Sequence, residues 1–209
     1  MVPVFYNPDP DICREVIKAC WEGGSSVFEF TNRGDFAHEV FAEISKWAAR
    51  ECPGLMLGAG SVPDAGTASL YIQMGACFIV SPFLNAEVAK VCNRRKVLWI
   101  PGCGTLTEIS EAEELGAEIV KIFPGTAVGG PGFVKAVKGP CPWTSIMPTG
   151  GVEPTEENLR EWFNAGVVCV GMGSALLTDK LVKAKSWQTI TSEVRKTIDI
   201  IEKLRSKRA

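Results

Sequence analysis

Histidine is nearly absent from this chain of 209 residues, which contains only His38. Histidine is the most common metal ligand in proteins, and the cysteines include no CxxC pair. Lysine and arginine are spread along the chain and the net charge is −2, so no basic surface for nucleic acid is indicated. No stretch approaches the roughly 18 apolar residues of a membrane-spanning helix. We therefore expect no metal site, no nucleic-acid partner and no membrane association.

A secretory signal is also missing from the first residues, which have neither a basic region nor a cleavage site. The eight cysteines are scattered rather than arranged as a disulfide framework, and we interpret them as reduced thiols. These features predict a cytoplasmic protein. Hydrophobic residues make up 46% of the chain, which excludes disorder, and we expect a single domain over residues 1–209.

Short apolar runs alternate with amphipathic stretches, and glycines such as Gly75, Gly116 and Gly166 precede several of the runs. Continuous apolar strands joined by helices are typical of a parallel sheet. Eight such units predict an α/β fold, a (β/α)₈ TIM barrel, with an open doubly wound sheet as the alternative. The predicted strands are 2–6, 26–30, 55–59, 76–80, 97–100, 119–123, 145–147 and 167–170, and a long helix at 181–205 closes the chain.

Lys121 lies in the middle of the sixth apolar run. An ammonium group is costly to bury and tends to lose its proton, and a neutral amine is the nucleophile of Schiff-base chemistry. The alternative is a lysine on an edge strand whose amine reaches solvent.

Glu29 belongs to the second run, and strand alternation places it on the face opposite Phe28 and Phe30. A carboxylate that points into a barrel suits general acid–base catalysis, although a structural ion pair explains it equally well. Arg33 follows in a loop, where its planar guanidinium suits a substrate carboxylate. A surface ion pair with Asp35 is the alternative for Arg33.

Glycine pairs follow the last two predicted strands, at Gly150–Gly151 and around Gly173, next to Ser174. The loops after strands seven and eight of such barrels frequently bind phosphate through backbone N–H groups. The two loops together therefore predict a phosphate site.

The residues so far assembled resemble the 2-keto-3-deoxy-6-phosphogluconate (KDPG) and 4-hydroxy-2-oxoglutarate (KHG) aldolases, which are class I pyruvate aldolases on a (β/α)₈ barrel. The resemblance extends from Val2 to about Leu177. It is carried by the segments 29–33, 58–62, 81–82, 101–102, 120–124, 129–130, 148–151 and 173–174.

The resemblance implies a role for each matching residue. Lys121 would form the Schiff base and Glu29 would move protons, while Arg33 and Thr149 would hold the pyruvyl carboxylate or its neighbours. The remaining matches would be substrate contacts at Ser61, Pro82 and Phe123, and phosphate contacts at Gly150, Gly151, Gly173 and Ser174. No cofactor is implied, because the imine accepts the electrons.

Four positions depart from the family pattern, at Ser61, Phe83, Gly125 and Thr126. Phe83 is expected either to narrow the mouth of the site or to reshape its aldehyde end. These changes leave the imine chemistry intact but leave open which keto acid is preferred.

The expected reaction is cleavage of a 2-keto-3-deoxy-6-phospho sugar acid into pyruvate and glyceraldehyde 3-phosphate, with 4-hydroxy-2-oxoglutarate as a second substrate. The phosphogalactonate-derived acid is an alternative substrate. A phosphate-binding barrel isomerase or synthase without imine chemistry, and a non-catalytic sensor, are alternative functions. A homotrimer is expected from the family and from apolar residues available for contacts, including Trp99, Trp143, Trp162 and Trp187.

Overall fold

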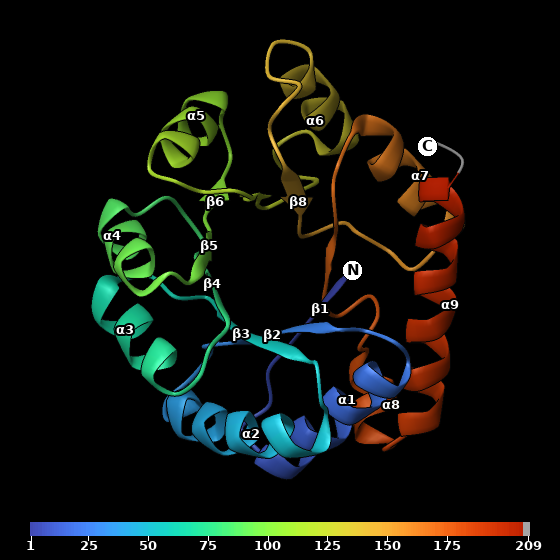
Figure 1. Cartoon of the computed structure of the whole chain (residues 1–209). Coiled ribbons are helices and arrows are strands. Elements are labelled where there is room, and N and C mark those ends of the chain that lie inside the picture. Colours follow the sequence, from blue (N-terminus) through green and yellow to red (C-terminus); the bar gives the residue numbers. More distant parts are fainter. Residues whose placement is uncertain (207–209) are drawn as a thin grey trace.

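Parallel strands alternate with helices around a ring in the computed structural model, which describes residues 1–206 (Figure 1). The strands are β1 (Val2–Phe5), β2 (Val27–Thr31), β3 (Met56–Gly60), β4 (Phe78–Val80), β5 (Leu98–Ile100), β6 (Gly102–Cys103), β7 (Val120–Ile122), β8 (Ile146–Pro148) and β9 (Gly171–Met172). The helices are α1 (Pro10–Glu22), α2 (Ala37–Glu51), α3 (Ala65–Gln73), α4 (Ala86–Arg95), α5 (Leu106–Glu114), α6 (Gly130–Lys138), α7 (Glu156–Ala165), α8 (Asp179–Lys183) and α9 (Trp187–Ser206).

The strands form two sheets that together close a barrel, in the orders β5-β4-β3-β2-β1-β9 and β6-β7-β8. Pro101 separates β5 from β6 because it has no N–H to donate, but Gly102 N resumes the ladder by donating to Ser81 O at 2.9 Å. A parallel bridge between Thr149 and Gly171 joins β8 to β9. With β5 and β6 counted as one interrupted strand, the predicted (β/α)₈ barrel is confirmed, and the open sheet is not formed.

Two elements differ from the prediction by more than two residues. The last strand is at Gly171–Met172 rather than 167–170, and Gly171 is needed there because a Cβ would lie 2.3 Å from Thr149 Oγ1. The closing helix is two helices, α8 and α9, because the backbone turns at Lys185 with a φ of 51°.

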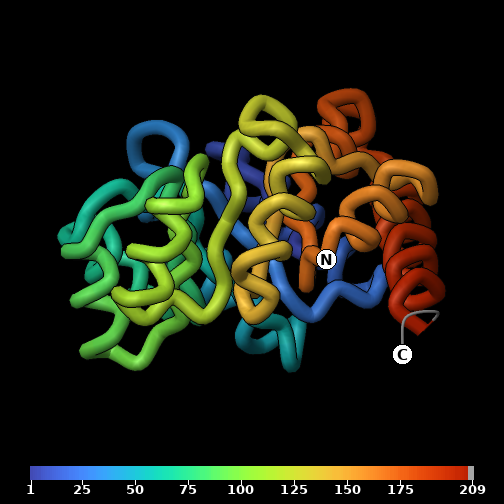
Figure 2. Tube along the Cα trace, turned by 90° about the horizontal axis from the view of Figure 1, so that it is seen from above, coloured from blue at the N-terminus to red at the C-terminus, as the bar shows by residue number. Residues whose placement is uncertain are grey.

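The long helix α9 packs against α1, although the two are far apart in the sequence. Figure 2 shows α9 at one outer edge of the molecule, on the side opposite α3 and α4, as in Figure 1. No helix of the described residues is both long enough and apolar enough to cross a membrane. All eight cysteines are free, and burial raises the pKa of the Cys13 and Cys103 thiols to about 12.

Two apolar clusters fill the fold. The larger one lies between the helices and the outer face of the strands and includes Phe28 and Phe30. The smaller one fills the barrel interior at the amino-terminal ends of the strands. Val27 and Ile119 pack against this inner cluster, so strand alternation places Glu29 and Lys121, two residues further on, one layer higher in the same interior. Its buried members are Val2, Phe78, Val80, Ile100 and Met147.

Candidate active site

Glu29 and Lys121 meet inside the barrel from β2 and β7. Lys121 Nζ lies 3.5 Å from Glu29 Oε1, and only 7% of the lysine side chain and 1% of the glutamate side chain are exposed. The amine also lies 5.3 Å from the centre of the Phe123 ring, within cation–π range. The alternative of an edge-strand lysine reaching solvent is therefore wrong.

The Glu29 carboxylate is buried without hydrogen bonds: within residues 1–206, neither Oε1 nor Oε2 accepts one. A buried acceptor left without a partner is costly, and native proteins keep few of them. Gly60 leaves room for this carboxylate, since a Cβ at that position would lie 1.9 Å from Oε1. The fold thus holds a carboxylate with free acceptor capacity next to a buried amine, and such an arrangement is typical of a catalytic pair.

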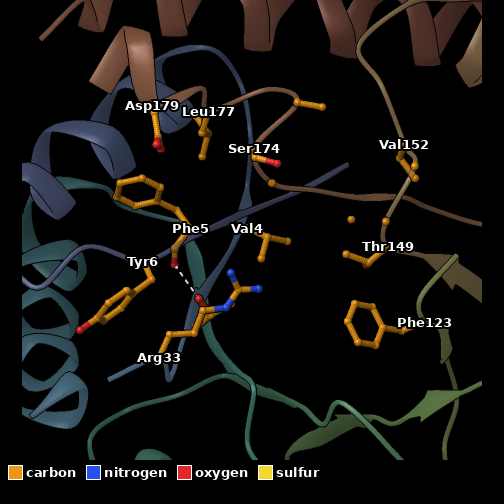
Figure 3. Close-up of a pocket in the computed structure, with 16 residues that line it drawn as sticks. Val4, Phe5, Tyr6, Arg33, Phe123, Thr149, Val152, Ser174, Leu177 and Asp179 are labelled. Atoms are coloured by element: carbon orange, nitrogen blue, oxygen red, sulfur yellow. Dashed lines mark hydrogen bonds between the residues drawn. The ribbon is translucent and has the colours of Figure 1, made fainter. Parts of the chain in front are cut away.

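Above the pair, at the carboxyl ends of the strands, is a cavity of about 350 Å³. Strand alternation explains its walls, because Thr31 lies two residues after Glu29 and Phe123 lies two residues after Lys121. Figure 3 shows Arg33, Phe123 and Thr149 extending toward this space. The residues that line it are Val4, Phe5, Tyr6, Thr31, Arg33, Phe123, Thr149, Gly150, Gly151, Val152, Gly171, Gly173, Ser174, Ala175, Leu177 and Asp179.

Most of the predicted site residues meet at this cavity. Lys121 and Glu29 lie in the layer beneath it, and Ser61 and Pro82 are not among its lining residues. Ser61 follows β3 with a φ of 56°, and the Pro82 carbonyl lies against Gly102. The predicted site residues that do line the cavity are Arg33, Phe123, Thr149, Gly150, Gly151, Gly173 and Ser174.

Arg33 forms no ion pair within the described part of the chain. The alternative interpretation, a surface ion pair with Asp35, is therefore wrong for these residues. Its side chain reaches from the loop after β2 into the cavity (Figure 3). A guanidinium without a partner in the wall of a cavity can bind an anion.

Thr149 supplies a second group without a partner. Its Oγ1 is buried and has no hydrogen bond within residues 1–206. This hydroxyl can therefore donate to, or accept from, a molecule in the cavity.

The glycine loop after β8 rests on the loop after β7. Gly125 N donates to Thr149 O at 2.9 Å, and Thr126 N donates to Gly150 O at 3.2 Å. Gly150 and Gly151 have φ values of 94° and 77°, which favour glycine. The departures at Gly125 and Thr126 thus shape the wall of the predicted phosphate loop.

Phe83, another departure from the family pattern, is half exposed and does not line the cavity. The loop that carries Phe83 packs closely on β6. Gly102 permits this close approach, since a Cβ there would lie 3.0 Å from Phe83 N.

Three polar residues that line the cavity were not predicted from the sequence: Tyr6, Thr31 and Asp179. Tyr6 directly follows β1, so the rule that functional groups occupy the carboxyl ends of barrel strands could have found it. Asp179 begins α8, seven residues after β9 ends, and no local pattern marks it.

The site combines a buried amine, a carboxylate with free acceptors, an arginine and a glycine-lined outer wall. The described residues contain no group of three or more histidine, cysteine, aspartate and glutamate side chains that could hold a metal ion. A buried lysine beside a carboxylate in a (β/α)₈ barrel, open at the carboxyl ends of the strands, is the arrangement of a Schiff-base aldolase, which is a lyase.

Comparison with known proteins identifies the family. The model of the KDPG and KHG aldolases matches residues 1–193, and the chain belongs to this family. It is 33% identical to a 2-dehydro-3-deoxy-phosphogluconate aldolase of Pseudoalteromonas atlantica, over 95% of this chain and 89% of that protein. It is also 38% identical to a 2-dehydro-3-deoxy-6-phosphogalactonate aldolase of Escherichia coli, over 58% of each chain.

A solved structure shares the fold and supports the chemistry. The KDPG aldolase of Legionella pneumophila, with pyruvate captured as a covalent carbinolamine, matches with a TM-score of 0.84 and 26% identity, over 93% of this chain and 91% of that one. The predictions of the family, the fold and an aldolase activity are confirmed.

Proposed function

We propose that this protein cleaves 2-keto-3-deoxy-6-phosphogluconate into pyruvate and glyceraldehyde 3-phosphate through a Schiff base on Lys121. The observation that carries the proposal is the contact of 3.5 Å between the buried Lys121 amine and the Glu29 carboxylate. Pyruvate captured as a carbinolamine in the related structure supports the same chemistry. Relatives that are named for this substrate support its identity.

In the proposed reaction, the neutral Lys121 amine attacks the C2 ketone, and the resulting carbinolamine takes up a proton from solvent and loses water to give a protonated imine. Glu29 accepts the proton of the C4 hydroxyl, directly or through one water. The C3–C4 bond breaks, its electron pair moves into the imine as an enamine, and the aldehyde leaves. Glu29 gives that proton to C3 of the enamine, and hydrolysis of the protonated imine then releases pyruvate and a proton and restores the neutral amine.

The cavity gives the substrate a direction. Arg33 and the unpartnered Thr149 hydroxyl bind the carboxylate end close to Lys121. The backbone of Gly150, Gly151 and Gly173, with the Ser174 hydroxyl, holds the distal phosphate. Phe123 lies against the amine and excludes water from it.

A kinetic panel tests this function. The phosphogluconate-derived acid, the phosphogalactonate-derived acid and 4-hydroxy-2-oxoglutarate are compared by kcat/KM, with pyruvate release as the readout. We expect the phosphogluconate-derived acid to give the largest value. Turnover of none of the three would refute the proposal.

A second candidate is preferential cleavage of the phosphogalactonate-derived acid, which differs in configuration at C4. The observation that favours it is the 38% identity to the phosphogalactonate aldolase, although that match covers only 58% of each chain. A larger kcat/KM for this acid in the same panel would decide for the second candidate.

We further propose that the enzyme works without a metal or cofactor, in the cytoplasm, as a homotrimer whose unit is a single domain. The imine itself withdraws the electrons, which removes the need for a metal. Of the tryptophans considered for the trimer contact, Trp99 and Trp162 are buried in the core, whereas Trp143 is 70% exposed. Phe83, in the loop after β4, and Leu106, at the start of α5, are also exposed and add apolar surface. A light-scattering mass of one 22.6 kDa chain at micromolar concentration would refute the trimer.

A further inference from the structure

Arg33 lies in a loop, and a loop residue must be held in place if it is to meet a substrate in a fixed geometry. The neighbouring residue Asn32 supplies two such attachments. Its backbone N–H donates to Gly60 O at 2.8 Å, and its side-chain Oδ1 accepts a hydrogen bond of 2.9 Å from the Tyr71 hydroxyl. Both neighbours of Asn32, Thr31 and Arg33, line the cavity.

Tyr71 is a rigid donor for this bond. It comes from α3, outside the strands, and is completely buried. Its ring packs edge-to-face on Phe41 at 5.0 Å between centroids, and Phe41 packs in turn on Phe30. Burial, with a further contribution from Tyr6, raises the pKa of Tyr71 to about 12, so the phenol keeps its proton at neutral pH.

We propose that Tyr71 is a positioning residue: its hydroxyl fixes Asn32 and thereby aims the Arg33 guanidinium at the carboxylate end of the substrate. This inference rests on the role proposed above for Arg33. Tyr71 does not line the cavity and acts only through Asn32. Removing its hydroxyl should therefore weaken anion binding without slowing the bond-making steps at Lys121.

Pyruvate trapping separates these two effects. Borohydride reduces the imine between pyruvate and Lys121, so the pyruvate concentration that gives half-maximal labelling reports binding, and the labelling rate at saturating pyruvate reports chemistry. The readout depends on pyruvate alone and stays valid whichever sugar acid the enzyme prefers.

Tyr71→Phe removes only the hydroxyl and keeps the ring that packs on Phe41. We expect the half-saturating pyruvate concentration to rise by about three- to tenfold, the effect of one hydrogen bond, with the saturating rate unchanged within about twofold. Thr197→Val is the matched control. Thr197 is also completely buried and bonds through its hydroxyl to Glu193 O, but it belongs to α9 and does not line the cavity.

A double-mutant cycle with Arg33→Ala tests whether Tyr71 acts through Arg33. Arg33→Ala alone should weaken pyruvate binding, and adding Tyr71→Phe to it should have little further effect. If Tyr71→Phe weakens binding equally in both backgrounds, or has no effect while Arg33→Ala does, Tyr71 does not position Arg33. If Arg33→Ala itself leaves binding unchanged, the proposed role of Arg33 fails and this inference fails with it, while the Lys121 imine is unaffected.

Should Tyr71→Phe fail to fold, as judged by circular dichroism, Asn32→Leu removes the same hydrogen bond from its acceptor side. The same rise in half-saturating pyruvate is expected, and unchanged binding in Asn32→Leu would overturn the inference.

Discussion

The floor and the outer wall of this site differ in their exposure to water. At the floor, Lys121 and Glu29 expose 7% and 1% of their side chains, whereas Gly150, Gly151 and Ser174 in the outer wall are exposed. The floor is made of side chains on two strands, which place atoms firmly. The outer wall is made largely of backbone in loops, and its shape depends on the neighbouring loop at Gly125 and Thr126.

We infer from this difference in exposure that the floor carries out the chemistry and that the outer wall selects the substrate. The imine step takes place at the floor, on the Lys121 amine, which the fold keeps away from bulk water. In the proposed direction of the substrate, the three keto acids of the kinetic panel present the same ketone to the floor. Their distal groups differ and would meet the outer wall, so changes there should alter substrate choice and leave the imine step intact.

The largest expected effect of the variants below is at the floor. Glu29→Gln keeps the size of the side chain but removes the base, so turnover should fall by about 10²- to 10⁴-fold. The loss should be the same for the phosphogluconate-derived acid and for 4-hydroxy-2-oxoglutarate, because both need the same proton transfers. A loss below about threefold would reassign Glu29 to a structural role.

In the outer wall, Gly173→Ala should discriminate between substrates. A Cβ at Gly173 would lie 3.4 Å from Val4 O, an ordinary contact, so the loop can accept a methyl group that crowds the phosphate. We expect kcat/KM to fall by about tenfold or more for the 6-phospho acid and to change little for 4-hydroxy-2-oxoglutarate.

Gly173 is a better position for this test than Gly151, where a Cβ would lie 2.0 Å from Thr126 Cγ2 and would displace the loop itself. Gly132→Ala in α6 is the control, because no atom lies within 4 Å of a Cβ there. An equal loss for both substrates in Gly173→Ala would mean that the loop supports the barrel and does not recognise phosphate.

Ser174→Ala should show the same preference more weakly. The hydroxyl can give one hydrogen bond to the phosphate, but it is exposed, and water competes for that bond. We expect a loss of about three- to tenfold for the 6-phospho acid, measured as kcat/KM, and no loss for 4-hydroxy-2-oxoglutarate. A larger loss for the substrate without phosphate would contradict the assigned direction of the substrate.

Much of the fold could be predicted from local patterns. Glycine before a strand, apolar runs of four or five residues and helical spacing between them indicated the barrel, and a lysine within such a run indicated the floor of the site. Strand alternation correctly placed Glu29 in the same interior as Lys121, because side chains on a strand alternate between two faces.

The rest depended on contacts between distant segments. The break between α8 and α9 is a backbone turn at Lys185, which no proline or glycine marks. Ser61 and Pro82 were expected at the cavity but do not line it, because the path of a loop after a strand is not set by the strand pattern. The bond from Tyr71 to Asn32 joins residues 39 positions apart, and neither residue has a neighbour in sequence that indicates it.

The most direct test of the account is the identity of the lysine that reacts with pyruvate. The protein is incubated with pyruvate, reduced with borohydride, digested, and mapped by peptide mass spectrometry, with Lys121→Met as the control. The account predicts one three-carbon adduct per chain, located on Lys121, and none in the variant. An adduct on another lysine, or no adduct in the unmodified protein, would contradict it.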